Sequence, residues 1–177
     1  MKKALYMLSE FSDRDFDWLM HAGKRKNVPA KEILIYEGEP TDAFYLVLQG
    51  TLAVSVEAMG GEEIARLGTG EIVGEMSFID SRPPAATVKA VEDSLVWAIP
   101  RMKLAAKLLQ DVEFACHFYH AIAVFLADRL RGTVSRLGYD QEHPPNDDES
   151  NVNPQVIDNL DLAKARLNWL LNRLRGS

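Results

Sequence analysis

The residues best suited to bind a ligand lie where a glycine is followed by a carboxylate, at Gly74, Glu75, Met76 and Ser77. A glycine lets the chain turn sharply, and the free backbone N–H groups of a helical turn that starts there can bind an anion. The Glu75 carboxylate can accept hydrogen bonds from sugar hydroxyl groups. This stretch therefore predicts a binding site for an anion and a sugar.

Metal and acid–base chemistry have weaker support. Glu113, His117 and His120 recur at helical spacing and could share one face of a helix. No second cluster supplies the remaining ligands, so we expect no metal site. No histidine occurs from Val28 to Ile99, which argues against a cupin enzyme with a metal on strand histidines. No Ser-His-Asp or Cys-His arrangement is indicated either, and the sequence predicts neither an enzyme nor a cofactor.

Apolar residues recur with a period of two in the sequence around the glycine–carboxylate stretch. From Val28 to Ile99, short apolar runs are separated by glycine-containing turns, and Leu52, Val54 and Val56 alternate as in a half-buried strand. Short strands at this spacing predict an antiparallel roll, barrel or sandwich. The basic run 24–26, which precedes them, is interpreted as a solvated turn after a helix.

Helices are predicted on both sides of the strands. Ser12 can cap a first helix, with Asp15 at the third position of a capping box and Gly23 at its end. After Pro100 the pattern predicts a short helix over 101–109 and a long one over 111–137. The apolar stripe of the long helix consists of Val112, Phe118 or Tyr119, Ile122, Leu126 and Leu130. Such a stripe often pairs with a partner.

The C-terminal part divides into two segments. Residues 138–153 are polar, with five acids and neither Lys nor Arg, and are predicted to be a flexible linker. A final amphipathic helix is predicted over 154–177, with Asn153 as its cap. Its apolar stripe consists of Val156, Leu160, Ala163, Leu167, Leu170 and Leu174. This a/d spacing indicates docking on another helix.

Five stretches together carry a family resemblance: Glu37-Gly38-Glu39-Pro40, Phe44-Tyr45-Leu46-Val47-Leu48-Gln49-Gly50, the Gly68/Gly70 turn, Gly74-Glu75 and Ala85-Ala86-Thr87-Val88. With the entry helix they make residues 5–137 resemble the cyclic nucleotide-binding domain family. The resemblance implies a mainly β fold, an eight-stranded antiparallel β-roll of the jelly-roll (double-stranded β-helix) type. It also implies an N-terminal helix and a long C-terminal dimerisation helix. The predicted domain is then 1–137, with the roll at 28–99 and helices at 100–137.

The same resemblance assigns roles within the site and exposes one departure. In the family, the carboxylate at the position of Glu75 binds the ribose 2′-hydroxyl, and the amides at the positions of Met76 and Ser77 face the cyclic phosphate. Members that bind cyclic nucleotides usually pair an arginine with that phosphate. This chain has Pro84 at that position, which offers neither a cation nor an N–H group. A charge-assisted bidentate contact contributes about 1.5–3 kcal/mol, so weak binding of cyclic AMP is expected.

The residues around Pro84 refine that expectation. Arg82 is the nearest alternative cation, although Pro83 and Pro84 stiffen the intervening chain. Ala85 lacks a hydroxyl group for a guanine amino group, so cyclic AMP is favoured over cyclic GMP. Ala85 and Ala86 complete the candidate ligand-binding set.

The function predicted from these observations is a non-enzymatic regulatory or signalling module that senses cyclic AMP or a related nucleotide weakly. The alternative is a degenerate roll that acts as a dimerisation or protein–protein interaction module without nucleotide. The predicted assembly is a homodimer through 111–137 and 156–174, and an effector protein could be a further partner. After the long helix, 138–177 offers no recognition helix, so DNA is not an expected partner.

Charge and composition agree with this class of function. The 177 residues carry a net charge of −6, which disfavours nucleic acid as the main partner. Residues 28–99 contain twelve acidic and four basic residues. Their net charge of −8 opposes the binding of an anionic ligand. No apolar stretch is long enough to span a membrane, and the N-terminus lacks a signal-peptide core. One cysteine, Cys116, excludes an internal disulfide. We therefore expect a cytoplasmic protein with no membrane partner.

Overall fold

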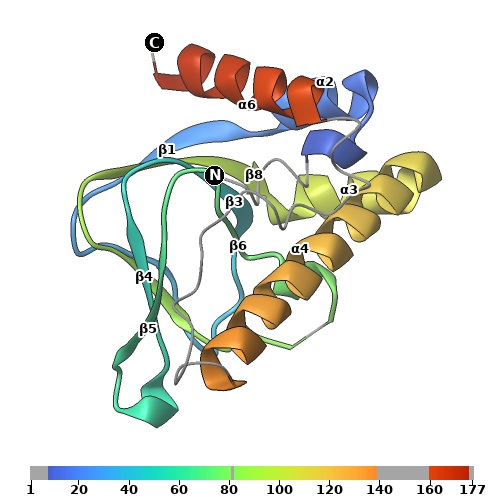
Figure 1. Cartoon of the computed structure of the whole chain (residues 1–177). Coiled ribbons are helices and arrows are strands. Elements are labelled where there is room, and N and C mark those ends of the chain that lie inside the picture. The colour runs from blue at the N-terminus through green and yellow to red at the C-terminus, as the bar shows by residue number, and fades with distance from the viewer. Residues whose placement is uncertain (1–7, 81, 139–159, 176–177) are drawn as a thin grey trace.

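A computed structural model describes residues 8–80, 82–138 and 160–175 (Figure 1). Two antiparallel sheets of four strands each form the body, with strand orders β1-β8-β3-β6 and β2-β7-β4-β5. The strands are β1 (Lys24–Val28), β2 (Ile33–Ile35), β3 (Ala43–Gln49), β4 (Leu52–Ser55), β5 (Glu63–Leu67), β6 (Ile72–Val73), β7 (Thr87–Ala90) and β8 (Ser94–Pro100). The predicted antiparallel β-roll with flanking helices is confirmed.

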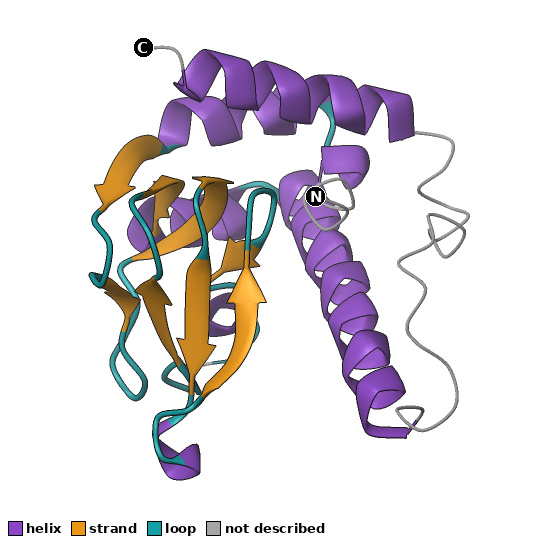
Figure 2. Cartoon of the chain, turned by 60° about the vertical axis from the view of Figure 1, so that its left-hand side comes forward, coloured by secondary structure: helices purple, strands orange, loops and turns teal. Residues whose placement is uncertain are grey.

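Alternation along the central strands produces two apolar layers. On β3, Tyr45 and Val47 point into the space between the two sheets, where they join residues of β4 and β7. Phe44, Leu46 and Leu48 point to the other face, where the helices cover them. Six of the seven residues of β3 are buried because both faces of this strand are covered. Figure 2 shows the helices gathered against the sheets.

The first strand, β1, begins at Lys24, before residue 28, where the sequence predicted the roll to begin. Residues 24–26, interpreted as a solvated turn, belong to β1, so that interpretation is wrong. Lys24 pairs with Ala98 and Lys26 with Val96 on the neighbouring strand β8. Backbone pairing with a central strand can place polar residues in an edge strand, and lysine is frequent there. Gly23 precedes the strand because a Cβ atom would lie 2.1 Å from Nε1 of Trp97.

Helix α2 (Asp13–Ala22) begins with the predicted capping box. The Ser12 hydroxyl accepts a hydrogen bond from the Asp15 backbone N–H, and the Asp15 carboxylate accepts one from the Ser12 backbone N–H. Burial raises the pKa of Asp15, but hydrogen bonds from Ser12 and His117 outweigh it and hold the pKa below its usual range. The indole of Trp97 donates to the Leu19 carbonyl and fixes α2 on the sheet.

After the strands come α3 (Arg101–Gln110) and α4 (Val112–Gly138), close to the predicted limits. The predicted stripe of α4 is split between two faces. Phe118 and Ile122 are fully buried against the roll, together with Phe125. Val112 and Leu130 are 82 % and 64 % exposed. The stripe therefore packs partly on its own roll and leaves a second apolar face outward.

The terminal helix α6 (Leu160–Arg175) packs on α2, as Figures 1 and 2 both show. Its buried residues Ala163, Leu167 and Leu170 join the layer that covers the outer face of β3. Arg166 is 7 % exposed and donates to the carbonyls of Leu8 and Phe11 and to the Asp13 carboxylate. Three acceptors from the N-terminal segment thus satisfy one buried cation.

This packing bears on the predicted assembly. The described part of the apolar stripe in 156–174 is already covered within the chain, whereas the sequence predicted it as part of the homodimer interface. The chain folds this way because α2 and sheet β1-β8-β3-β6 offer apolar surface next to acceptors for Arg166. The predicted linker beyond Gly138, the cap at Asn153 and residue Val156 lie outside the described residues. Among the described helices, none combines the length and apolar character needed to cross a bilayer.

Candidate functional site

The glycine–carboxylate stretch forms a compact turn, which we call the cassette and define as residues 74–78. It leaves the end of β6 at Gly74, whose φ is +85°. A Cβ atom there would lie 2.8 Å from the Ala43 carbonyl oxygen. Both observations require glycine. The predicted helical turn follows as the short 3₁₀ helix η2 (Met76–Phe78), with Glu75 at the N-cap position but without a side-chain cap hydrogen bond.

Glu75 is the buried carboxylate of the cassette, with 3 % of its surface exposed. Its Oε1 lies 2.8 Å from Nη1 of Arg129 on α4. Burial raises the pKa of Glu75, and the positive charge of Arg129 opposes that rise. The carboxylate predicted to meet a sugar hydroxyl is thus held by a cation from the long helix, 54 residues further along the chain.

Arg129 is the residue of this site that sequence reasoning missed. Its guanidinium lies over the Phe125 ring, 4.5 Å from the centroid, and Nη2 approaches the Ile72 carbonyl at 3.4 Å. A signal for it existed. Phe118, Ile122, Phe125 and Arg129 follow one another at spacings of four, three and four, which places them on one helix face. A cation within a buried apolar face requires a partner.

The rest of the cassette connects the site to the helices. Met76 is 46 % exposed, whereas Ser77 is buried and its carbonyl accepts from Nη2 of Arg101. The Phe78 ring packs edge-on against Phe118 of α4, with centroids 6.0 Å apart. The cassette therefore contacts α4 through an ion pair on one side and an aromatic pair on the other.

The predicted phosphate-binding position lacks a basic side chain. The Pro84 carbonyl accepts from the Gly38 N–H at 2.9 Å, which ties this segment to the turn after β2. The Arg82 side chain is 83 % exposed and binds the Asp80 carboxylate. Hydrogen bonding to Arg82 lowers the pKa of Asp80. Ala85 is exposed and Ala86 is half-buried. The structure thus brings Gly74, Glu75, Met76 and Ser77 together but directs Arg82 to a local partner.

Residues 25–111 match the family model described as the cyclic nucleotide-binding domain. The β-roll belongs to that family. The Cyclic AMP receptor protein of Thermus thermophilus is 34% identical over 110 residues, which cover 61% of this chain and 49% of that protein. The cAMP-dependent protein kinase regulatory subunit of Pyricularia oryzae is 29% identical over 125 residues, which cover 63% of this chain and 32% of that protein.

A solved cyclic nucleotide-binding domain from Methylobacillus flagellatus, 24% identical, has the same fold. Its TM-score is 0.68, and the match covers 81% of this chain and 85% of that one. The chain spans less than half the length of the two curated relatives. The family resemblance of the sequence is therefore confirmed for the roll. The module is of the regulatory cyclic nucleotide-binding type.

The histidines of α4 have structural partners in this cyclic nucleotide-binding domain. His117 Nδ1 lies 2.7 Å from Oδ2 of Asp15, and His120 Nδ1 lies 2.7 Å from Oε2 of Glu10. Glu113 is exposed. Within the part of the chain that the structure describes, no three histidine, cysteine or carboxylate side chains are grouped to hold a metal ion. The two histidines instead join α4 to the N-terminal segment.

Proposed function

We propose that the cassette binds cyclic AMP weakly and that the occupied site biases the position of α4. One observation carries this proposal: the Glu75 carboxylate is buried at a glycine turn although burial raises its pKa. A buried carboxylate is costly, and groups whose pKa is perturbed by burial and a specific charged partner cluster at functional sites. The Thermus and Pyricularia relatives are named for cyclic AMP, which supports that ligand class.

The contact between Glu75 and Arg129 provides a route from ligand to helix. A ribose hydroxyl that donates to Glu75 would share its carboxylate with Arg129, 2.8 Å away. The ligand would then favour one of two arrangements of α4 relative to the roll. Because Phe78 also packs on Phe118, the aromatic contact would move together with the ion pair.

The predicted affinity is low because the position that pairs with the phosphate in nucleotide-binding members holds Pro84 in this chain. Arg82 is exposed and paired with Asp80, and Pro84 has no charge to offer. We expect a dissociation constant on the order of tens of micromolar or poorer for cyclic AMP. Pro84→Arg should tighten binding about ten-fold or more by restoring a charge-assisted contact.

Calorimetric titration with cyclic AMP tests this proposal. Arg82→Ala is the matched control, and it should leave the weak affinity unchanged because Arg82 is directed to Asp80. Submicromolar binding by the natural chain, or equal affinities of the Pro84→Arg variant and the natural chain, would contradict the proposal. Complete absence of binding by both would favour the alternative, an interaction module without nucleotide.

The outward face of α4 favours a second role, dimerisation. Val112, Tyr119 and Leu130 are 82 %, 43 % and 64 % exposed, and spacings of four and three residues through Cys116, Ala123 and Leu126 connect them. This is the a/d pattern of a helix that pairs with a second helix. We infer a homodimer through α4, with α6 remaining on its own roll.

Light scattering tests the dimer. The expected mass is that of two chains, and Leu130→Glu should reduce it to one, because a carboxylate buried at the seam is costly only in the assembled state. Ile64→Glu is the control, since Ile64 is 45 % exposed on β5, an edge strand of the sheet β2-β7-β4-β5. A natural chain with the mass of one copy would exclude the dimer.

A further inference from the structure

Three adjacent cations lie on the edge strand β1, in a protein whose roll is otherwise acidic. Lys24, Arg25 and Lys26 are consecutive, and β1 is the outermost strand of its sheet. None of the three forms an ion pair with another described residue. The following residues 28–99 carry twelve acids and four bases, so carboxylates are not scarce. The three charges are therefore available to an external anion.

A cavity of about 400 Å³ opens beside these cations. It extends over β1, β8 and β3, and Tyr45, Ala98 and Asp42 contribute to its lining. Tyr45 is fully buried, and its hydroxyl donates to the Asp42 carboxylate. The ammonium group of Lys26 lies 5.9 Å from the centroid of the Tyr45 ring. The cavity thus has a fixed aromatic wall with a cation beside it.

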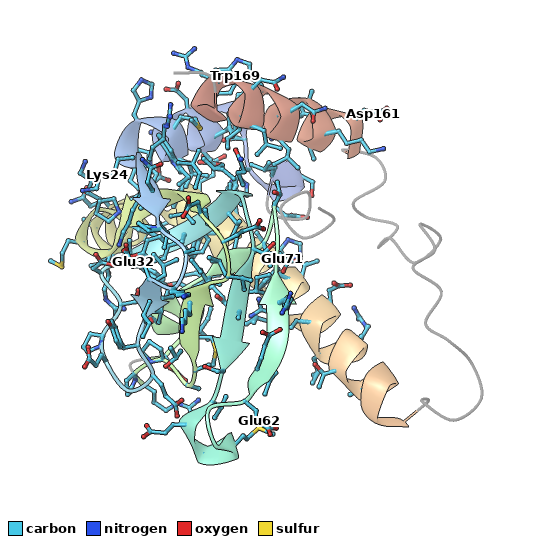
Figure 3. All side chains as sticks on the ribbon, turned by 90° about the vertical axis from the view of Figure 1, so that its left-hand side faces the viewer. Lys24, Glu32, Glu62, Glu71, Asp161 and Trp169 are labelled. Atoms are coloured by element: carbon cyan, nitrogen blue, oxygen red, sulfur yellow. The ribbon has the colours of Figure 1, made fainter. Side chains whose placement is uncertain are left out.

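The cations of this cavity lie apart from the cassette. In the sheet β1-β8-β3-β6 the cations lie on one edge strand, and the cassette follows the strand at the opposite edge. Figure 3 shows Lys24 well apart from Glu71, the residue that precedes β6. Two residues join the two places. Ala43 lines the cavity, and its carbonyl oxygen would lie 2.8 Å from a Cβ atom at Gly74 of the cassette. Arg101 is the second. The backbone N–H of Arg101 donates to the Asp42 carbonyl, and its guanidinium donates to the Ser77 carbonyl of the cassette.

We propose that this cavity binds the phosphate group of a small phosphorylated molecule. Lys24 and Lys26, together with the Asp42 carboxylate, give this side of the lining a charge of +1, which attracts a phosphomonoester dianion. Lys24 and Lys26 lie two residues apart and pair with Ala98 and Val96, so they start from the same face of the strand. Lysine ammonium groups bind phosphate as compact point charges.

Calorimetry with inorganic phosphate and pyrophosphate at low ionic strength tests the proposal. We expect submillimolar binding that weakens as sodium chloride is added. The double variant Lys24→Ala/Lys26→Ala should bind at least about ten-fold more weakly, the factor expected from one lost charge-assisted contact. Asp42→Asn should bind more tightly, because it removes the opposing charge while an amide oxygen can still accept from Tyr45.

Two controls separate this cavity from other anion sites. Lys89→Ala/Lys164→Ala removes two exposed lysines elsewhere and should leave binding unchanged. Glu75→Gln alters the cassette and should also leave phosphate binding unchanged. No binding up to about 10 mM pyrophosphate, or an equal loss in both double-lysine variants, would overturn the proposal. Thermal unfolding of each variant verifies that the roll is intact.

Discussion

Replacing Arg129 by glutamine should destabilise the protein at neutral pH and much less in acid. The substitution leaves the Glu75 carboxylate buried, at 3 % exposure, without its cation. With charge centres about 4 Å apart and an effective dielectric constant near 20, the pair attracts by about 4 kcal/mol. The Arg129 side chain is 32 % exposed, so solvent screens part of this attraction. We therefore expect a loss of about 2–3 kcal/mol in the free energy of unfolding.

The pH dependence follows from the direction of the Glu75 pKa shift. Burial raises that pKa, and removal of Arg129 should raise it further. A carboxyl group with a higher pKa in the folded state binds more protons when folded, so stability falls as pH rises. The loss caused by Arg129→Gln should be complete near about pH 7.5 and small near about pH 4, where Glu75 is protonated.

Urea unfolding at both pH values measures this effect. A loss of about 2–3 kcal/mol corresponds to a fall of several degrees in Tm for a chain of this size. The double variant Glu75→Gln/Arg129→Gln should recover most of the loss, since no charge is then left buried. Arg131→Gln, at an exposed position two residues away, is the control. A loss below about 0.5 kcal/mol, or an equal loss at both pH values, would refute the reasoning.

Two further substitutions test how the site is supported. Gly74→Ala should lower the free energy of unfolding in urea by about 2 kcal/mol or more, because alanine would have to adopt a positive φ and its Cβ would meet the Ala43 carbonyl. Gly38→Ala is the control. Gly38 has φ +78° and no neighbour within 4 Å, so that substitution should cost about half as much. Arg166→Met should cost about 3 kcal/mol and make α6 more sensitive to proteolysis, since buried acceptors lose their donor. Lys164→Met, at an exposed position on the same helix, should change neither measurement.

The parts of the fold that the sequence predicted depend on local patterns. The capping box at Ser12 and Asp15 and the turn at Gly74 use short-range hydrogen bonds and backbone preferences, which leave a clear signal in adjacent residues. The limits of α3 and α4 were close for the same reason. The family motifs added the β-roll architecture, whereas periodicity alone left a roll, a barrel and a sandwich open.

The parts that could not be predicted depend on contacts between distant segments. Strand β1 is stabilised by pairing with β8, about seventy residues later in the chain. Considered alone, its basic sequence is typical of a solvated loop. The ion pair of Glu75 with Arg129 joins residues 54 apart, and Arg166 meets carbonyls more than 150 residues earlier. The helical period of the sequence cannot show which of the two apolar faces of α4 packs on the roll, because both faces carry large apolar side chains.

The return of α6 to α2 determines where anything attached to the chain would be located. Helix α4 runs along the roll away from α2, and a reporter placed at its end would lie far from that N-terminal helix (Figure 1). A reporter at the end of α6 would instead lie on the side of α2, held there by Arg166. Energy transfer between two fluorophores at these positions would report the distance from the end of α4 to the end of α6. Their separation would change with movement of that helix, even while the roll itself stayed rigid.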